Sequence, residues 1–515
     1  MNFRRFFSKV SLGLCAFLLV GSTAFAVAAD APVAPTETLQ AVISADETAA
    51  LGANAEFSAA HSLNLFPERP AVFTWNFGDG TTGSGETVTH AFTKPGIFKI
   101  TLAMRVGKET AETSFEFFVF ARSALLLTDS RTYEDKIAAL SGAAREQNIF
   151  LDTAWGVEDQ VGFFAGENAL TAALQARFEA LRSTNLIILW TRGSEGLNSL
   201  ASFAQKLNPP LDFSAKEIVV ISDGNLDSLA RIARGNFAAL APREILLTRS
   251  DALREILLTD DIATLAQKLE LQAIPLQVID SGLEAFKITA PLSFLVNYLV
   301  ASGIPASVIL LVLMLPVIAT LVAFLKQVVG VTTLGVYTPS VLTLAFLAIG
   351  WKLGIIVLCV VVFASVLIRK ILRRYRLAYT PRLAIVLSFV ALAIFAAIVL
   401  MTWLAPLGSY YRVADLIAAS IFPMLIMSTL AEKFVSIQSE KGSRSAIRML
   451  SELLLVSLAC YLVVGQWSGF QTLMLAHPEI IFLFIAGDVL LAKFTGLRIT
   501  EYVRFRELLQ KEEEE

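Results

Sequence analysis

Two aspartates are the residues of this sequence best placed to bind a ligand. Asp129 and Asp223 lie at the ends of apolar runs, 124–127 and 217–222, that predict β-strands. Ligands of parallel sheets bind beyond the carboxyl ends of the strands, so the two carboxylates could together hold a cation. Asp and Ser are also ordinary helix N-caps after a strand, and this interpretation is favoured. No phosphate-binding glycine loop follows a strand, and the spaced serines of a D-x-S-x-S metal site are missing.

Three further candidates lie in the apolar second half of the chain. Asp488 is an ionisable residue in a long apolar run, where a charged group is by default a functional hypothesis, but an ion pair with Lys493 is an equal alternative. Tyr337 and Pro339 belong to the segment 330–340, which contains two glycines and a proline. This segment predicts either a broken or re-entrant helix that lines a cavity, or a kinked helix packed through small residues, which is the favoured alternative.

Residues for catalysis are few. The sequence has three histidines and three cysteines, and all three cysteines (Cys15, Cys359 and Cys460) lie in apolar runs. Neither a nucleophile–base pair nor an acid–base pair is visible, and thiolates for a zinc site are lacking. The sequence therefore predicts no enzyme, no metal and no cofactor. The net charge of -3 gives no indication of nucleic-acid binding.

The composition places part of the chain in lipid. The 515 residues are 55% hydrophobic and 17% charged, with a mean hydropathy of +0.64, whereas soluble domains carry about a quarter charged residues. Most of the apolar excess lies beyond Pro291. Seven apolar runs, each near the ~20 residues that cross a bilayer, predict transmembrane helices. They are 304–325, 333–349, 353–372, 383–404, 413–434, 449–465 and 473–492.

The N-terminus, residues 1–29, has the three-part pattern of a secretory signal peptide. Arg4, Arg5 and Lys9 precede the apolar run 10–20, and small residues after it fit an A-x-A cleavage site. The run is too short to span a bilayer comfortably, although an uncleaved anchor helix is the alternative. After a linker at 30–37, we expect the soluble region to be exported.

The distribution of basic residues predicts the same orientation. With the soluble region outside, only Lys352 and Arg412 lie in outer loops, whereas sixteen Lys and Arg lie in cytoplasmic segments, as the positive-inside rule requires. The sixteen are Lys326, Arg369, Lys370, Arg373, Arg374, Arg376, Arg382, Lys433, Lys441, Arg444, Arg448, Lys493, Arg498, Arg504, Arg506 and Lys511. The tail at 496–515 is therefore expected in the cytoplasm.

Residues 38–122 alternate short β-rich runs with turn signals and predict an antiparallel β-sandwich. The segment resembles the PKD-type repeat, an immunoglobulin-like fold marked by W-x-F-G-D-G, H-x-[YF] and P-G-x-[YF]-x-[IV]-x-[LV]. The resemblance implies an extracellular binding or spacing module. Asp79 suggests a cation site and His90 a ligand, but the favoured interpretation is that both stabilise turns. The matching residues are Trp75, Phe77, Gly78, Asp79, Gly80, His90, Pro95 and Gly96.

Residues 123–282 alternate apolar strands with amphipathic helices and predict a Rossmann-like α/β domain with a mostly parallel sheet. A juxtamembrane segment at 283–303, with an interfacial helix at 292–301, is expected before the seven-helix domain at 304–495. The predicted strands are 124–127, 149–153, 186–190, 217–222, 244–248 and 277–279, and the predicted helices are 133–147, 170–181, 197–207 and 226–240.

The second half of the chain resembles one bacterial family. The likeness covers 290–506 and rests on the runs 330–346, 369–376, 381–386 and 496–506. The family has a seven-helix membrane domain that is usually fused to an inactive transglutaminase-like domain. This chain departs from it by carrying the PKD-type and α/β domains in that place, without a Cys-His-Asp set in the exported part. The resemblance is consistent with a role other than catalysis.

These features favour a non-enzymatic, multi-pass protein of the bacterial inner (cytoplasmic) membrane. Its exported PKD and α/β domains are expected to bind a protein, peptide or glycan of the cell envelope, and its membrane domain to anchor them or relay their state. The alternative is a transporter or exporter component with a site at the broken second span. The lipid bilayer is the partner that the composition requires, nucleic acid is not expected, and the sequence does not determine an oligomeric state.

Overall fold

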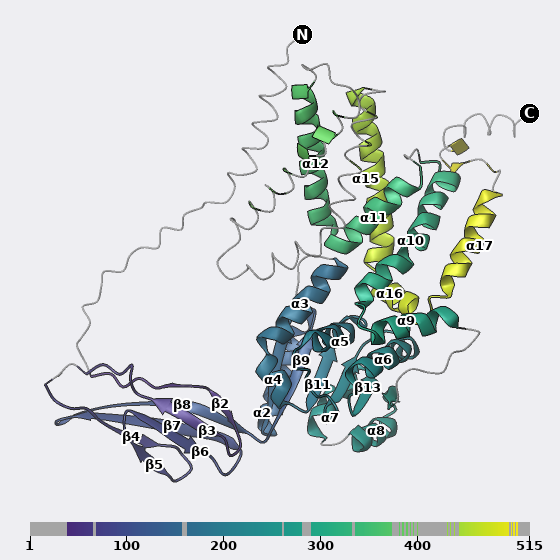
Figure 1. The fold of residues 1–515 in the computed structure, drawn as a ribbon. Coiled ribbons are helices and arrows are strands. Elements are labelled where there is room, and N and C mark those ends of the chain that lie inside the picture. Colours follow the sequence, from purple (N-terminus) through teal and green to yellow (C-terminus); the bar gives the residue numbers. More distant parts are fainter. Residues whose placement is uncertain are drawn as a thin grey trace, which may run out of the picture. The chain divides into compact units, whose positions relative to one another are not determined.

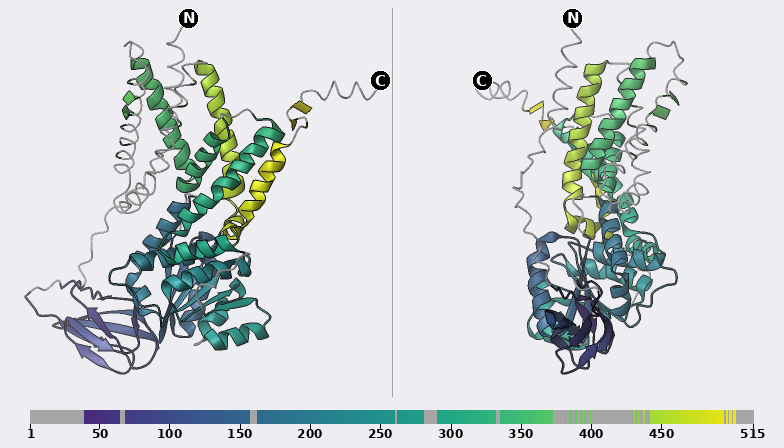
Figure 2. Two further views of the ribbon diagram at one scale, coloured as in Figure 1. Left: turned by 45° about the vertical axis from the view of Figure 1, so that its right-hand side comes forward. Right: turned by 90° about the vertical axis from the view of Figure 1, so that its left-hand side faces the viewer.

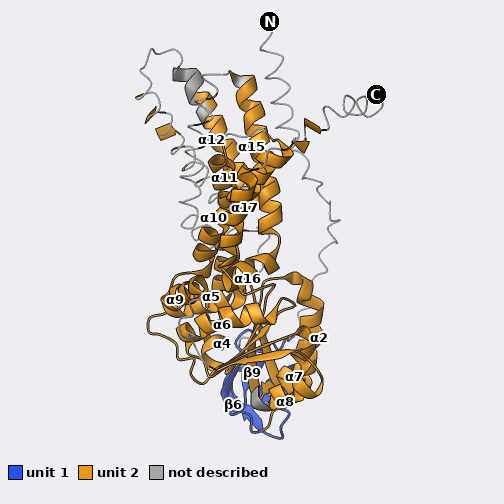
Figure 3. Ribbon diagram, turned by 90° about the vertical axis from the view of Figure 1, so that its right-hand side faces the viewer, with its two compact units in different colours: residues 1–93, 97–118 blue, residues 94–96, 119–515 orange. Residues whose placement is uncertain are grey.

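The computed structural model describes residues 39–64, 68–156, 162–259, 262–280, 290–331, 335–372 and 442–493, with single residues from 381 to 437 and from 496 to 502 (Figure 1, Figure 2). It divides into two compact units, one of residues 1–93 with 97–118 and one of residues 94–96 with 119–515 (Figure 3). The predicted signal peptide and linker lie outside the described residues. The predicted helices at 383–404 and 413–434 and the tail at 496–515 lie almost entirely outside them.

The first unit contains two antiparallel sheets that share one core. Its three-stranded sheet has the order β1-β3-β6, and its five-stranded sheet the order β2-β8-β7-β4-β5. The strands are β1 (Ser44–Ala45), β2 (Thr48–Ala50), β3 (Asn54–Ser58), β4 (Val72–Asn76), β5 (Thr82–Ser84), β6 (Thr87–Ala91), β7 (Gly96–Val106) and β8 (Glu109–Phe120).

Aromatic side chains join the two sheets of this unit. Phe57 on β3 is fully buried and contacts Trp75 on β4 and Phe117 on β8, with ring centroids 6.0 and 5.1 Å apart. Along β7, every second side chain is buried, because successive residues of a strand point to opposite faces. The predicted sandwich is therefore present, with Trp75 in its core as expected.

The α/β part of the second unit is built on a six-stranded sheet of order β10-β9-β11-β12-β13-β14. The first five strands are parallel and β14 is antiparallel to β13. The strands are β9 (Arg122–Thr128), β10 (Ile149–Trp155), β11 (Leu186–Trp190), β12 (Glu217–Ile221), β13 (Glu244–Thr248) and β14 (Leu276–Ile279). Each predicted strand is present within one or two residues at either end.

Helices cover both faces of this sheet (Figure 1). Along β9, Leu125 and Leu127 pack on one face and Ala124 and Leu126 on the other, which explains a strand that is apolar throughout rather than alternating. One face is covered by α3 (Phe163–Ala176), α4 (Phe178–Ser183), α5 (Glu195–Lys206) and α6 (Leu226–Leu240), and the other by α2 (Glu134–Glu146), α7 (Leu253–Leu258) and α8 (Ile262–Leu271).

The prediction of one helix over 170–181 was wrong. The helix α3 begins earlier, at Phe163, and a break at Arg177, whose φ of -113° is not helical, separates it from α4. The amphipathic pattern continues across the break because both helices pack their apolar residues on the same face of the sheet.

Seven helices of the described second half follow the α/β sheet. They are α9 (Pro291–Ala301), α10 (Ala306–Phe324), α11 (Tyr337–Ile349), α12 (Trp351–Leu372), α15 (Ser443–Gly465), α16 (Ser468–Ala476) and α17 (Ile480–Ala492). Figure 2 shows α10, α11 and α15 running side by side. The helix α11 is almost wholly buried, and it contacts α10, α12 and α15.

Two helices of the described residues are long and apolar enough to cross a membrane. They are α10 together with its π-helical turn, 306–329, and residues 444–465 of α15; a third span exists if α16 and α17 count as one. The prediction of a continuous helix over 473–492 was wrong, because these two helices meet at a bend of 105°. Pro478 lies at the bend, and a proline disfavours helical geometry in the residue before it.

The apolar core of the membrane helices continues into the α/β part. Ile232 of α6 belongs to the same buried cluster as Val296 and Val300 of α9 and the facing residues of α10 and α11. The helix α9, which the sequence predicted as a juxtamembrane helix, packs against α6 and α16. Within the second unit, the α/β part and the membrane helices are therefore one packed body.

Candidate functional site

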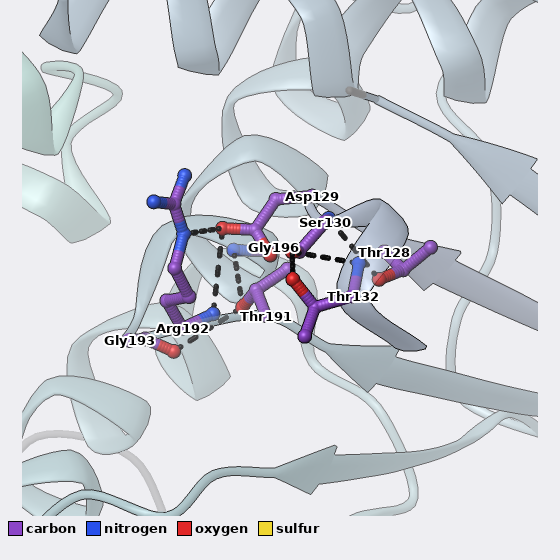
Figure 4. Close-up of polar contacts among 8 residues, drawn as sticks. All are labelled: Thr128, Asp129, Ser130, Thr132, Thr191, Arg192, Gly193 and Gly196. Atoms are coloured by element: carbon purple, nitrogen blue, oxygen red, sulfur yellow. Dashed lines mark hydrogen bonds and ion pairs between the residues drawn. The ribbon is translucent and has the colours of Figure 1, made fainter. Parts of the chain in front are cut away.

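The carboxyl ends of the neighbouring strands β9 and β11 bring two charged residues together. The guanidinium Nε of Arg192, after β11, donates to Asp129 Oδ2, after β9, at 3.1 Å. The backbone N–H of Arg192 donates to the same oxygen at 3.4 Å (Figure 4). The pairing follows from the parallel register, because adjacent parallel strands end at the same edge of the sheet.

The loop after β11 is held by its own hydrogen bonds. Thr191 Oγ1 donates to the carbonyl of Gly193 and accepts from the N–H of Gly196, both at 3.2 Å (Figure 4). Gly193 has no room for a side chain, since a Cβ there would lie 2.7 Å from Glu195 Oε2 and 3.1 Å from Thr472 Oγ1. The glycine therefore lets the loop approach both the start of α5 and the membrane helix α16.

Glu195, the first residue of α5, is the acidic residue of this region that sequence analysis missed. Its Oε2 atom is buried and has no hydrogen-bond partner within the part of the chain that the structure describes. Burial and the nearby charge of Asp129 raise the pKa of Glu195. Burial and the charges of Asp129 and Asp223 likewise raise the pKa of Tyr133. The charge of Arg192 lowers the pKa of both groups and offsets these effects only in part.

Asp129, Arg192 and Glu195 line a cavity of about 160 Å³ between the α/β part and the membrane helices, which we name the junction cavity. Its α/β wall includes the strand-end pair Asp129 and Arg192. The helices α10, α11, α15 and α16 supply the opposite wall. The other α/β lining residues include Glu167, Glu195, Asn198 and Ser199, and those of the membrane helices include Ser307, Leu310, Leu347, Tyr461, Gln471, Thr472 and Leu475.

Two carboxylates bond to the first turns of α9 and α10. Glu167 of α3 accepts a hydrogen bond from the hydroxyl of Ser307, the second residue of α10. Glu479, between α16 and α17, accepts from the N–H and the hydroxyl of Ser293 in α9, at 2.8 and 2.7 Å. Carboxylates are favourable there because the first N–H groups of a helix have no partner within it.

A close backbone contact joins α3 to α11. A Cβ at Gly162, the N-cap of α3, would lie 2.7 Å from the nitrogen of Gly350 and 2.8 Å from the carbonyl carbon of Ile349. Both of these are main-chain atoms, so the contact cannot be relieved by turning a side chain. Only glycine fits at position 162 with the helices this close.

The other sequence-predicted site residues lie apart from this cavity. Asp223 is exposed after β12 and is not among the lining residues, so the structure brings Asp129 together with Arg192 and Glu195 instead. Among the described residues, no group of three His, Cys, Asp or Glu could hold a metal ion.

Pro339 and Tyr337 lie in the first turn of α11, where a proline is tolerated. The Pro339 carbonyl accepts from the hydroxyls of Thr343 at 2.8 Å and Ser457 at 3.1 Å, which ties α11 to α15. Tyr337 is 70% exposed, and its ring centroid lies 5.1 Å from Lys433 Nζ. On α17, Asp488 Oδ1 is buried and makes no hydrogen bond to any residue that the structure describes.

The motif residues of the first unit mostly satisfy one another. Asp79 accepts from the N–H and hydroxyl of Thr81 and contacts His90 Nε2 at 2.7 Å. The His90 ring stacks on Phe77, with centroids 4.1 Å apart, and Trp75 Nε1 donates to the Gly85 carbonyl at 2.9 Å. Burial alone would raise the pKa of Asp79, but the hydrogen bonds from Thr81 and His90 lower it to about 2.

The glycines of the motif allow backbone conformations with positive φ. Gly78 and Gly80 have φ of +76° and +92°, and a Cβ at Gly78 would lie 2.8 Å from the Lys99 carbonyl oxygen. Pro95 precedes β7, and Gly96, with φ of +145°, is its first residue. These positions form turns because glycine adopts positive φ at little cost.

A β-sandwich, an α/β part and apolar helices of membrane-crossing length define a multi-pass membrane protein. Residues 298–509 match the family of seven transmembrane helices usually fused to an inactive transglutaminase, and residues 34–119 match the PKD domain. Both resemblances drawn from the sequence are confirmed. No curated protein matches the chain at a significant level.

Proposed function

We propose that this chain is a non-enzymatic receptor and relay of the bacterial inner membrane. Its exported PKD and α/β domains bind a protein, peptide or glycan of the cell envelope, and the membrane domain responds to that binding. The observation that carries the proposal is the packing of the α/β part directly onto the membrane helices. A domain that serves only as a tethered binder needs no such shared core.

The proposed relay depends on two close contacts between helices of the α/β part and the membrane helices. Besides the contact of Gly162 with Gly350, a Cβ at Gly235 of α6 would lie 2.9 Å from Asn297 Oδ1 and 3.3 Å from Asn297 Cα in α9. A displacement of α3 or α6 must therefore move α11 or α9, because packed cores do not deform continuously. Both α3 and α6 cover the same face of the sheet.

The proposed orientation places the α/β part outside and the tail inside. It is supported by the ends of the described helices. Ser307 and Gly465 line the junction cavity beside the α/β part, and Gly350 contacts Gly162 of the α/β part. The basic segments around Arg369 and Arg444 lie at the other ends of α12 and α15. A Rossmann-like class for the sheet, seven spans, and cleavage of the signal peptide belong to the same proposal.

Orientation is tested by fusing a reporter that is active only outside the cytoplasm after residue 122 or after residue 515. We expect activity from the first fusion only. A cytoplasmic readout from the first fusion would overturn the proposed layout.

Relay is tested with the full-length protein in lipid nanodiscs, to which glycan, peptide and protein fractions of the envelope are added separately. We expect one fraction to bind and to change hydrogen exchange in α10 and α11. The Gly162→Ala variant should bind the same fraction and lose this change, whereas Gly166→Ala, in open space on the same helix, should keep it. Binding without any change in the membrane helices would reduce the membrane domain to an anchor.

The second candidate function is a transporter or exporter component. It is favoured by the polar groups buried in the membrane helices: Thr338, Ser340 and Thr343 in α11, and the unpartnered Asp488 Oδ1 in α17. Ionisable groups at such depth are typical of substrate or proton paths. The variants Asp488→Asn and Pro339→Ala should then lower flux in cells, and unchanged flux and phenotype in both would remove this candidate.

A further inference from the structure

The junction cavity has a charge imbalance. Its described lining holds three carboxylates, those of Asp129, Glu167 and Glu195, and one cationic side chain, Arg192. Arg192 is paired with Asp129, and Glu167 is bonded to Ser307 at the start of α10. Glu195 is the remaining carboxylate, and its buried Oε2 has no hydrogen-bond partner. A carboxylate in this position is expected to be either protonated or paired with a cation.

Two more buried oxygens of the cavity lining lack partners. Ser199 is 1% exposed, and its hydroxyl makes no hydrogen bond. The Asp129 side chain is 10% exposed, and its Oδ1 makes none either, although Oδ2 is held by Arg192. Buried polar atoms are nearly always hydrogen-bonded, so three oxygens of one cavity without a partner among the described residues point to a donor outside those residues.

The opposite wall of the cavity carries polar side chains, among them Gln471 and Thr472, beside an apolar part. Leu310, Leu347 and Leu475 come from three different membrane helices and meet there. A cavity of about 160 Å³ is close in size to engineered protein cavities that hold a benzene ring. The space therefore suits a ligand with one polar end and a short apolar remainder.

We propose that the junction cavity binds a small primary ammonium ion with a short apolar tail. An ammonium group has three donors and no acceptor, which matches in number the unpaired oxygens of Glu195, Asp129 and Ser199. The tail lies against the leucines of the membrane helices. A metal ion is disfavoured, since the described residues contain no group of three His, Cys, Asp or Glu placed to hold one. Burial raises the pKa of Glu195, and the charge of Arg192 offsets this rise only in part.

The test uses full-length protein in detergent micelles at neutral pH and three probes of equal size: n-butylamine, 1-butanol and butyrate. Binding is measured by calorimetry and by the rise in Tm at millimolar probe. We expect saturable binding of the amine, at least about ten-fold weaker binding of the alcohol, and none of butyrate. The alcohol also corrects for partition of the probes into the micelle.

Variants locate the site. Glu195→Gln keeps the shape of the side chain and should weaken amine binding about ten-fold, removing the preference over butanol. Ser199→Ala should weaken it less, and the exposed control Glu146→Gln should have no effect. Equal binding of butylamine and butanol, amine binding that is unaffected by Glu195→Gln, or no saturable binding of any probe would each overturn the proposal.

The proposal goes beyond the proposed receptor function, and the two can fail separately. Butylamine reports on the cavity alone, whereas the envelope fractions report on the exported domains and their relay. A failure of butylamine to bind would leave the receptor proposal standing, and a failure of the envelope fractions to bind would leave the cavity proposal standing.

Discussion

An acid of the PKD sandwich and an acid of the junction cavity differ in how their oxygens are satisfied. Asp79 accepts hydrogen bonds from Thr81 and contacts His90, and its pKa is lowered to about 2. Glu195 has a buried oxygen without a partner, and burial and the charge of Asp129 raise its pKa. The first carboxylate is stabilised as an anion by its own turn. The second needs a proton or a ligand.

The difference separates structural motifs from binding sites. A conspicuous sequence motif such as W-x-F-G-D-G proves to be a set of residues that bond to one another. The less conspicuous Glu195 has a buried oxygen without a hydrogen-bond partner among the described residues. Unpaired buried groups are therefore a better guide to a ligand site in this protein than the presence of a recognisable motif.

The largest effect is expected in the sandwich core, from Trp75→Ala. Trp75 is fully buried, and replacing a large aromatic by alanine leaves a cavity that costs about 3–5 kcal/mol of unfolding free energy. The control Val72→Ala, on the same strand but 57% exposed, should cost less than about 0.5 kcal/mol. Hydrogen exchange of residues 72–106 in the full-length protein measures both. If the two variants exchange alike, the sandwich is not stabilised by its own core.

The sandwich was predictable because its signals are local. Trp75, Phe77 and the turn at Asp79–Gly80 lie within a few residues, and the bonds that satisfy Asp79 come from Thr81 and His90 nearby in sequence. The strands of the α/β part were predictable for the same reason. The central strands β9, β11, β12 and β13 are short apolar runs whose two faces are both buried.

The junction cavity was not predictable from the sequence. Glu195 stands at the start of a helix, where an acid is ordinary, and nothing near it in sequence indicates burial. Ser307, Gln471 and Thr472, which line the same cavity, lie far along the chain. The break before α17 did have a signal, Pro478, but the apolar run around it outweighed the proline in the prediction.

The next effect is expected at the contact between α3 and α11. Gly162→Ala places a Cβ within 2.8 Å of main-chain atoms of Ile349 and Gly350 and should destabilise the protein by about 1–3 kcal/mol. Gly166→Ala, within α3 and with no atom within 4 Å of a new Cβ, should instead stabilise it by about 0.5–1 kcal/mol. Thermal unfolding in detergent compares the two. Equal Tm values would mean that the α/β part and the membrane helices are not closely packed at this point.

A further effect on stability is expected from Glu195→Gln. The raised pKa of Glu195 means that the folded protein holds this proton more tightly than the unfolded chain, so stability is full below the ordinary glutamate pKa of 4.5 and falls as the pH rises through the folded pKa. Glutamine removes the buried charge, and the variant should be about 1–3 kcal/mol more stable than the parent at pH 8.

Unfolding of the Glu195→Gln variant and its parent is followed from pH 4 to pH 8, with Glu146→Gln as the exposed control. Butylamine should raise the stability of the parent at pH 8 more than that of Glu195→Gln. A variant less stable than its parent at pH 8 would show that the ionised carboxylate already has a partner in the protein.

The smallest effect is expected from Asp79→Asn. Because the folded pKa of Asp79 is about 2 and its ordinary value is 3.8, its contribution to stability is present above pH 3.8 and is lost as the pH falls towards 2. The side chain is 17% exposed, so solvent screening limits this contribution to about 1 kcal/mol.

The parent should therefore become more sensitive to pepsin, within the sandwich, between pH 4 and pH 2. Asp79→Asn should already be sensitive at pH 4 and change little below it, whereas the exposed control Asp46→Asn should follow the parent. If Asp79→Asn also follows the parent, the Asp79–His90 contact does not stabilise the turn. Asp79 would then not be an anion stabilised by its own turn, and it would no longer differ from Glu195 in this respect.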